Sequence, residues 1–200
     1  HATAVEIDRD LAAWLKETFP DTLTLIEADA LKLDWTEVHP EARLRVVGNL
    51  PYNISSPLLF HLMTVADRVI DQHFMLQKEV VDRMVAAPGS KVYGRLSVML
   101  QYRYRMQKMF DVPPGAFTPA PKVTSSIVRM IPKKADEMPP VNWERFSEIV
   151  ATAFNQRRKT LRNALGKLLT EEQIKSAGVD PALRAEALDV TAFVKLANIA

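Results

Sequence analysis

The residues with the clearest chemical potential are Asn49, Leu50, Pro51 and Tyr52, which directly follow the apolar run Leu44–Gly48. The exocyclic amine of adenine is a poor nucleophile, and a side-chain amide oxygen and a backbone carbonyl that accept its hydrogens can activate it. Asn49 and Leu50 offer these two oxygens. Pro51 restricts the backbone, and Tyr52 offers a ring on which an extruded base can stack. Taken alone, however, these four residues favour an ordinary turn.

Two carboxylates stand at the ends of two earlier predicted strands. Glu6 lies at the end of the first strand, and Asp29 follows the second. Because the carboxyl ends of parallel strands meet at one crevice, these carboxylates can accept hydrogen bonds from ribose hydroxyls and from an adenine amine. Ile7 could pack on the face of the adenine. Either acid alone is an ordinary loop residue, but polar residues after three successive strands predict a nucleoside site.

The elements that position these residues alternate short apolar runs with amphipathic stretches, which is typical of βαβ units and a largely parallel sheet. Strands are predicted over 4–7, 23–26, 44–48 and 74–76, and helices over 8–19, 55–65, 78–87 and 93–102. The residues Ser55, Ser56 and Pro57 are predicted to supply a serine cap for the second helix, with the proline in its first turn. Two further strands, 106–112 and 124–131, flank a proline-rich loop and predict an antiparallel hairpin at the sheet edge.

A linker is predicted over 135–140, because its Pro-Pro pair cannot continue a helix. Every later segment has a helical pattern: 142–154, 156–165, 170–177 and 191–199, with another helix start at Asp180 and Pro181. The sequence therefore predicts an α/β domain over 1–134 and a small all-helical domain over 141–200.

Composition restricts the class of protein further. The 200 residues are 48% hydrophobic and include no cysteine, which excludes disulfides and thiolate-bound metals. No metal site is predicted. No run approaches the roughly 18 apolar residues of a membrane span, so we expect a cytoplasmic protein.

The charges are unevenly distributed along the chain. Residues 1–82 hold 14 acids and 7 bases, whereas residues 83–200 hold 10 acids and 19 bases. This asymmetry predicts that one face of the protein binds a polyanion such as RNA. On the helix predicted over 156–165, Arg158 and Arg162 would share one face.

Several longer strings carry a specific resemblance. They are Glu6–Asp8, Asp29–Ala30, Asn49–Ser55, Gln77–Val80, Pro113–Val123 and Phe154–Leu161. Over essentially the whole chain, they resemble the ribosomal RNA small-subunit adenine N6-dimethyltransferases of the KsgA type. The resemblance implies a Rossmann-like sheet, S-adenosylmethionine as cofactor, and dimethylation of two adjacent adenosines near the 3′ end of small-subunit ribosomal RNA during ribosome biogenesis.

The resemblance also implies roles for individual residues of the cofactor site. Glu6 would bind the ribose, Ile7 would contact the adenine, and Asp29 with the backbone of Ala30 would read the adenine edge. Asn49 would contact the cofactor as well as the target adenosine.

Further roles concern the RNA. Asn49 and the Leu50 carbonyl would hold the target amine, with Pro51 shaping their turn, while Tyr52 and Phe117 would sandwich the target base. The residues expected to bind the RNA backbone are Lys122, Arg157, Arg158, Lys159 and Arg162. The expected partner is the small subunit or its assembly intermediate, with the protein as a monomer.

The sequence departs from the family at its start, where the glycine-rich loop and the first strand are absent. We therefore expect an N-terminally truncated chain with weak cofactor binding and weak or no activity. Two alternatives stay open. Similar Asn/Asp-Pro-Pro-Tyr turns serve DNA adenine and protein glutamine methyltransferases, although Leu50 and the string Phe154–Leu161 favour RNA. The second alternative is a catalytically silent ribosome-assembly or nucleic-acid-binding factor on the same fold.

Overall fold

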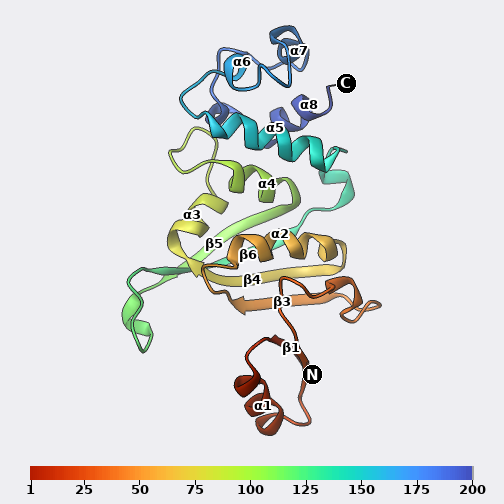
Figure 1. The fold of residues 1–200 in the computed structure, drawn as a ribbon, viewed down its shortest axis with the longest axis vertical. Coiled ribbons are helices and arrows are strands. Elements are labelled where there is room, and N and C mark those ends of the chain that lie inside the picture. Colours follow the sequence, from red (N-terminus) through yellow and green to blue (C-terminus); the bar gives the residue numbers. More distant parts are fainter. Residues whose placement is uncertain (200) are drawn as a thin grey trace. The chain divides into compact units, whose positions relative to one another are not determined.

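The computed structural model describes residues 1–199 (Figure 1). The chain forms two compact units. Unit 1 consists of His1–Arg43 and Pro51–Arg68, and unit 2 consists of Leu44–Leu50 and the chain from Val69 onward. The backbone therefore passes between the two units three times.

Unit 1 opens with a strand, a helix and a second strand. Their bounds are β1 (Ala2–Glu6), α1 (Arg9–Thr18) and β2 (Leu23–Glu27). The two strands pair in parallel, which the crossover helix between them allows. The Asp8 carboxylate accepts a hydrogen bond from the Leu11 N–H, and this cap fixes the start of the helix. The predictions for these three elements are confirmed.

The rest of unit 1 is helical. It contains η1 (Trp35–Glu37), α2 (Ser55–His61) and η2 (Leu62–Arg68), where η marks a 3-10 helix. The helix predicted over 55–65 starts where expected, but its second half is a 3-10 helix. The predicted serine cap is wrong, because Ile54 holds the cap position and Ser55 and Ser56 are the first two residues of the helix. The Ser55 hydroxyl instead donates to the Tyr52 carbonyl at 3.0 Å.

Unit 2 is built on a four-stranded sheet with the strand order β3-β4-β6-β5. The strands are β3 (Leu44–Asn49), β4 (Val69–Gln77), β5 (Tyr104–Val112) and β6 (Ser125–Pro132). β3 and β4 are parallel, whereas β6 is antiparallel to both of its neighbours. The predicted antiparallel hairpin at the sheet edge is therefore confirmed.

β4 is much longer than the strand predicted over 74–76. Its first half carries Asp71, Gln72 and His73, and these polar residues interrupt the apolar run by which a buried strand is recognised. In the folded chain Gln72 is fully buried and Asp71 is nearly so. β4 is a central strand of the sheet, and these two adjacent side chains point to its opposite faces.

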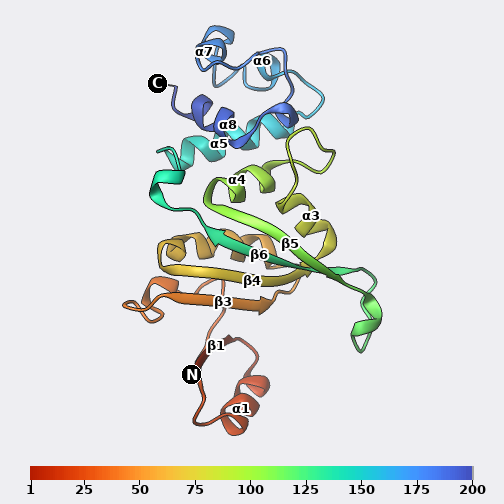
Figure 2. The ribbon, with the colours of Figure 1, turned by 180° about the vertical axis from the view of Figure 1, so that it is seen from behind.

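Helices α3 and α4 pack against this sheet, and α5 and α8 pack in turn on α4 (Figures 1 and 2). Their bounds are α3 (Lys78–Met84), α4 (Arg95–Arg103), α5 (Trp143–Asn155) and α8 (Val190–Ala197). The ring of Tyr102 on α4 lies 5.2 Å from that of Phe146 on α5, measured between centroids. Phe154 on α5 meets Phe193 on α8 at 5.6 Å. The late helices thus share a continuous core with α4.

The linker predicted over 135–140 contains the single turn η4 (Ala135–Glu137). The residues before and after it belong to the same compact unit. The division into domains over 1–134 and 141–200 stays a prediction.

The prediction of one helix over 156–165 is wrong. Only α6 (Leu161–Ala164) is helical, and the residues before it form a turn. Tertiary contacts replace the helical ladder here, since the Leu161 N–H donates to the distant Leu183 carbonyl at 2.8 Å. Arg158 therefore does not lie on a helix with Arg162.

The chain ends with α7 (Glu171–Ser176), η5 (Ala185–Ala187) and α8. The helix start predicted at Asp180 and Pro181 is wrong. The Asp180 carboxylate accepts the Ala182 N–H at 2.9 Å within a turn instead. Within residues 1–199, no helix is both long enough and apolar enough to cross a membrane.

Candidate functional site

Glu6 stands at the end of β1, opposite the last residue of β2. Its Oε1 atom accepts hydrogen bonds from the N–H groups of Ile7 and Asp8, both at 3.0 Å. These bonds fix the direction of the carboxylate, and its Oε2 atom has no hydrogen-bond partner within residues 1–199. Ile7 is 68% exposed. A fixed carboxylate with a free oxygen next to an exposed apolar side chain suits a ribose and its attached base.

Asp29 and Ala30 directly follow β2, where the Ala28 N–H donates to the Glu6 carbonyl at 3.1 Å. One carboxylate oxygen of Asp29 accepts the Leu31 N–H at 2.9 Å. The Ala30 N–H donates to no group in the described part of the chain. The structure thus brings Glu6, Asp29 and Ala30 together at one edge of unit 1.

Two side chains hold the loop that follows Asp29. The Trp35 indole N–H donates to the Ala30 carbonyl at 2.9 Å. The Arg68 guanidinium donates at 2.7 to 3.4 Å to the backbone carbonyls of Trp35, Thr36, Val38, His39 and Ala42. Sequence reasoning missed Arg68 because its partners lie 26 to 33 residues earlier. These partners are backbone oxygens, which every residue type has, so the sequence does not reveal them.

We expect Arg68→Lys to lower the free energy of unfolding by about 1–3 kcal/mol. The single ammonium group of lysine cannot donate hydrogen bonds to all the carbonyls that the planar guanidinium reaches at once. Urea unfolding followed by circular dichroism measures this. Arg43→Lys, at an exposed position of the same unit, is the matched control and should leave unfolding unchanged. Equal stability of the two variants would contradict a holding role for Arg68.

Asn49 ends β3, and Leu50 follows it at the same edge of the unit 2 sheet. The Leu50 N–H donates to the Met75 carbonyl of β4 at 3.2 Å, which holds the turn against the neighbouring strand. A Cβ at Gly48 would come within 3.0 Å of the Leu50 side chain, so glycine permits this close packing. Asn49 is exposed, and neither its amide nor the Leu50 carbonyl has a partner among residues 1–199. Both oxygens are free to accept.

Tyr52 and Phe117 belong to different units. Tyr52 is 75% exposed and lies in the turn closed by the Ile54 N–H, which donates to the Pro51 carbonyl at 3.2 Å. Phe117 is half-buried and follows η3 (Pro114–Ala116), in the loop that projects from the β5–β6 hairpin (Figure 2). Each ring is accessible within its own unit, and their sandwich around a base stays a prediction.

Arg157 is engaged with its own unit. Its Nη2 atom donates to the carbonyls of Lys91 and Tyr93 at 3.0 and 2.9 Å, and its Nε lies 3.6 Å from the Glu186 carboxylate. Arg157 therefore braces the turn after α5 against the loop that precedes α4.

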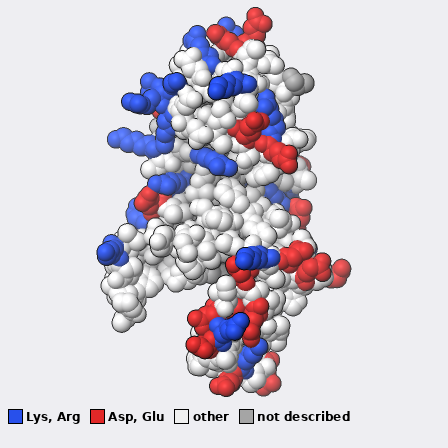
Figure 3. Space-filling model, in the orientation of Figure 1, with Lys and Arg blue, Asp and Glu red and all other residues white. Residues whose placement is uncertain are grey.

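The neighbouring bases differ from Arg157. Arg158 and Lys159 are exposed, and neither side chain has an ion-pair or hydrogen-bond partner in the described residues. Arg162 lies 3.6 Å from Glu171, and Lys122 is exposed in the loop of Phe117. Figure 3 shows basic side chains gathered at the upper left, over the α5–α6 turn and the α3–α4 loop. Unit 2 thus presents a basic surface.

Comparison with known proteins identifies relatives over the full chain. A model of the ribosomal RNA adenine dimethylase family matches residues 1–200. The ribosomal RNA small subunit methyltransferase A of Aromatoleum aromaticum is 59% identical over 199 residues, which cover 99% of this chain and 74% of that protein. A solved dimethyladenosine transferase from Plasmodium falciparum is 26% identical, with a TM-score of 0.78 over 97% of this chain and 79% of that one. The 23S rRNA methyltransferase ErmE, at 22% identity, has a TM-score of 0.72 over the same shares.

The α/β fold described above is thus the fold of these two methyltransferases, and the predicted fold class is confirmed. The match over all 200 residues and the high identity go further. This chain belongs to the ribosomal RNA adenine dimethylase family, as the sequence motifs indicated.

Proposed function

We propose that this protein transfers methyl groups from S-adenosylmethionine to the N6 amines of two adjacent adenosines near the 3′ end of small-subunit ribosomal RNA. Family membership supplies the class of reaction. The observation that carries the proposal is the pair of free acceptors at the end of β3, the Asn49 side-chain amide and the Leu50 carbonyl. The proposed partner is the small subunit or its assembly intermediate, and the proposed location is the cytoplasm.

Unit 1 fits the nucleoside part of S-adenosylmethionine. The free Oε2 of Glu6 can accept from the ribose hydroxyls, and Ile7 can cover one face of the adenine. The unbonded Ala30 N–H and the second carboxylate oxygen of Asp29 offer a donor and an acceptor to the adenine edge. When bound, S-adenosylmethionine supplies an electrophilic methyl group on a positively charged sulfur.

The end of β3 can activate the target amine. The lone pair of an aromatic amine is delocalised into the ring, and two acceptors that hold both hydrogens favour the pyramidal nitrogen whose lone pair can attack. The Asn49 amide oxygen and the Leu50 carbonyl suit this task. Neither group is a base, so the surplus proton of the methylated nitrogen passes to water. Orientation and proximity would then supply most of the rate enhancement.

The accessible rings of Tyr52 and Phe117 are proposed to stack on the extruded target base. Each stacking contact of this kind is worth roughly 1–3 kcal/mol. Holding the base by its faces leaves its amine edge open to Asn49.

A labelled methyl-transfer assay tests the proposed function, with this chain and with a version extended by the family's glycine-rich loop and first strand, for which full activity is expected. The substrates are naked ribosomal RNA, an immature small subunit and DNA of the matching sequence. We expect label in N6-dimethyladenosine of the RNA or the subunit and none in the DNA. Labelled DNA would favour a DNA adenine methyltransferase, and RNA binding without any label would favour a silent assembly factor.

The free cations of the α5–α6 turn are proposed to contact RNA phosphates. We expect Arg158→Ala and Lys159→Ala each to weaken RNA binding across sequences and to reduce the salt slope by about one unit. Arg157→Ala is expected to lower thermal stability instead, because it removes donors to two backbone carbonyls. Fluorescence titrations at several salt concentrations and thermal unfolding measure the two effects. An unaltered salt slope in both single variants would contradict the RNA contact.

A further inference from the structure

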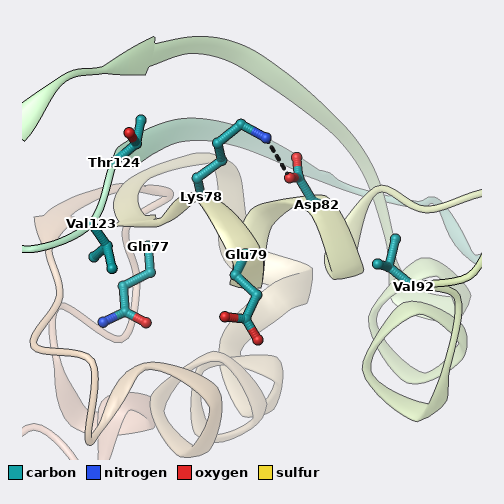
Figure 4. A pocket seen from close by; sticks show the side chains of 7 residues that line it. All are labelled: Gln77, Lys78, Glu79, Asp82, Val92, Val123 and Thr124. Carbon is teal, nitrogen blue, oxygen red and sulfur yellow. Dashed lines mark hydrogen bonds and ion pairs between the residues drawn. The ribbon is translucent and has the colours of Figure 1, made fainter.

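A pocket of about 370 Å³ opens at the end of β4, entirely within unit 2 (Figure 4). It is lined by Gln77, Lys78, Glu79, Asp82, Val92, Val123 and Thr124. Gln77 lies two residues beyond Met75, the β4 residue that pairs with Asn49. Because of the rise per residue of a strand, Gln77 lies about 7 Å beyond Asn49 along the strand direction. The Lys78 N–H donates to the Thr124 carbonyl at 2.9 Å, which ties β4 to the start of β6. The pocket therefore adjoins the edge where the target amine is proposed to bind.

The charged groups of this pocket are already paired. Lys78 lies 2.7 Å from one carboxylate oxygen of Asp82, and Lys108 lies 3.2 Å from the other. The hydrogen bond from Lys78, reinforced by Lys108, holds the pKa of Asp82 below its usual value. Glu79 pairs with Arg83 one turn further along α3. The lining thus offers one lysine, already paired, and two carboxylates, an arrangement that disfavours a phosphate group.

Two uncharged polar side chains of the lining, Gln77 and Thr124, have no hydrogen-bond partner within residues 1–199, and Gln77 is the longer of the two. Its amide makes no hydrogen bond within residues 1–199, and in Figure 4 it extends on the same side as the Glu79 carboxylate. A primary amide both donates and accepts, and glutamine can bind adenine through two such bonds. Val92 and Val123 are 44% and 46% exposed and offer apolar contacts to the faces of a base. These features fit a nucleobase with an exocyclic amine better than a sugar or a phosphate.

We infer that this pocket is a subsite for the base of a nucleotide that flanks the target adenosine, and that Gln77 reads this base with adenine preferred. The inference rests on the proposed function, because the Asn49–Leu50 turn defines where the target base lies. One RNA strand then spans both positions along the same sheet edge. Gln77 acts as a specificity-determining residue, apart from the chemistry at the amine.

Short RNAs that differ only in the nucleotides next to the target adenosine test this subsite. The unsubstituted protein should bind the RNA with flanking adenine about tenfold more tightly than the RNA with flanking uracil, since one bidentate pair gives about that discrimination. Gln77→Ala should abolish the preference without changing affinity for S-adenosylmethionine. Gln107→Ala, at an exposed glutamine on β5, is the matched control and should keep it.

A second variant protects the test against a folding defect. Gln77→Glu keeps the size of the side chain but only accepts hydrogen bonds, so the preference should move toward cytosine, whose N4 amine donates. A retained adenine preference in both Gln77 variants, with normal thermal unfolding, would overturn the subsite and leave the proposed function intact. Failure of the unsubstituted protein to bind or methylate any RNA would overturn the proposed function and the subsite with it.

Discussion

Asn49→Ala is expected to lower the rate of methyl transfer by about 100-fold or more while S-adenosylmethionine affinity stays nearly unchanged. The Asn49 amide has no hydrogen-bond partner within residues 1–199, so its removal disturbs no hydrogen bond among them. What it removes is a preorganised acceptor for the amine hydrogen, whose charge grows as the nitrogen attacks. Single contacts of this kind typically account for effects of that size.

Two further variants make this measurement specific. Glu6→Ala should chiefly weaken cofactor binding, because its carboxylate faces the ribose in the proposed complex. Asn53→Ala replaces another exposed asparagine a few residues away and should change neither quantity. Calorimetry with S-adenosylmethionine and a single-turnover assay separate affinity from rate. An Asn49→Ala variant that lost affinity as strongly as rate would contradict this division of roles.

Phe146→Ala is expected to lower the free energy of unfolding by about 3–5 kcal/mol, the range for a large ring removed from a packed core. Phe146 is fully buried, and its ring lies 5.2 Å from Tyr102 on α4 and 5.8 Å from Trp143. Truncation of Phe146 would leave a cavity between α4 and α5. Phe110→Ala, at a 59% exposed position on β5, is the control and should change stability by less than about 0.5 kcal/mol.

The shape of this transition also tests the predicted domain boundary. Since α4 and α5 share a core, we expect unit 2 to unfold in one transition. Circular dichroism and the fluorescence of Trp143 should then change together, measured in a chain whose unit 1 residues Trp14 and Trp35 are replaced by phenylalanine. Two separate transitions, with only one moved by Phe146→Ala, would support an independent domain over 141–200. Denaturant unfolding of both variants provides the comparison.

The sequence predicted the elements wherever hydrophobic spacing dominated. Both strands around α1 and the antiparallel hairpin at the sheet edge have the expected form. Hydrophobic spacing did not predict the first half of β4, because this central strand carries the polar residues Asp71 and Gln72. It also failed at 156–165, because long-range bonds such as that from Leu161 to Leu183 competed successfully with helix formation.

The residues of the candidate site also differ in whether the sequence alone could indicate them. Asn49, Glu6 and Asp29 could be proposed from sequence because their own side chains offer suitable chemical groups and follow predicted strands. Arg68 and Arg157 could not, because both act on backbone carbonyls that any residue type provides. Gln77 stood within a recognisable string, but only the folded pocket distinguishes it from the paired charges around it.

The division of the chain into interleaved units has a consequence for synthesis on the ribosome. β1 and β2 are close in sequence and can pair as soon as residue 27 has emerged, because local contacts form early. β3 belongs to unit 2 and emerges next, but its partner β4 follows only after the rest of unit 1 has been made. The Leu50 N–H therefore has no Met75 carbonyl to donate to until β4 is made. A nascent chain that pauses in between carries the two proposed amine acceptors, Asn49 and Leu50, without the strand that positions them.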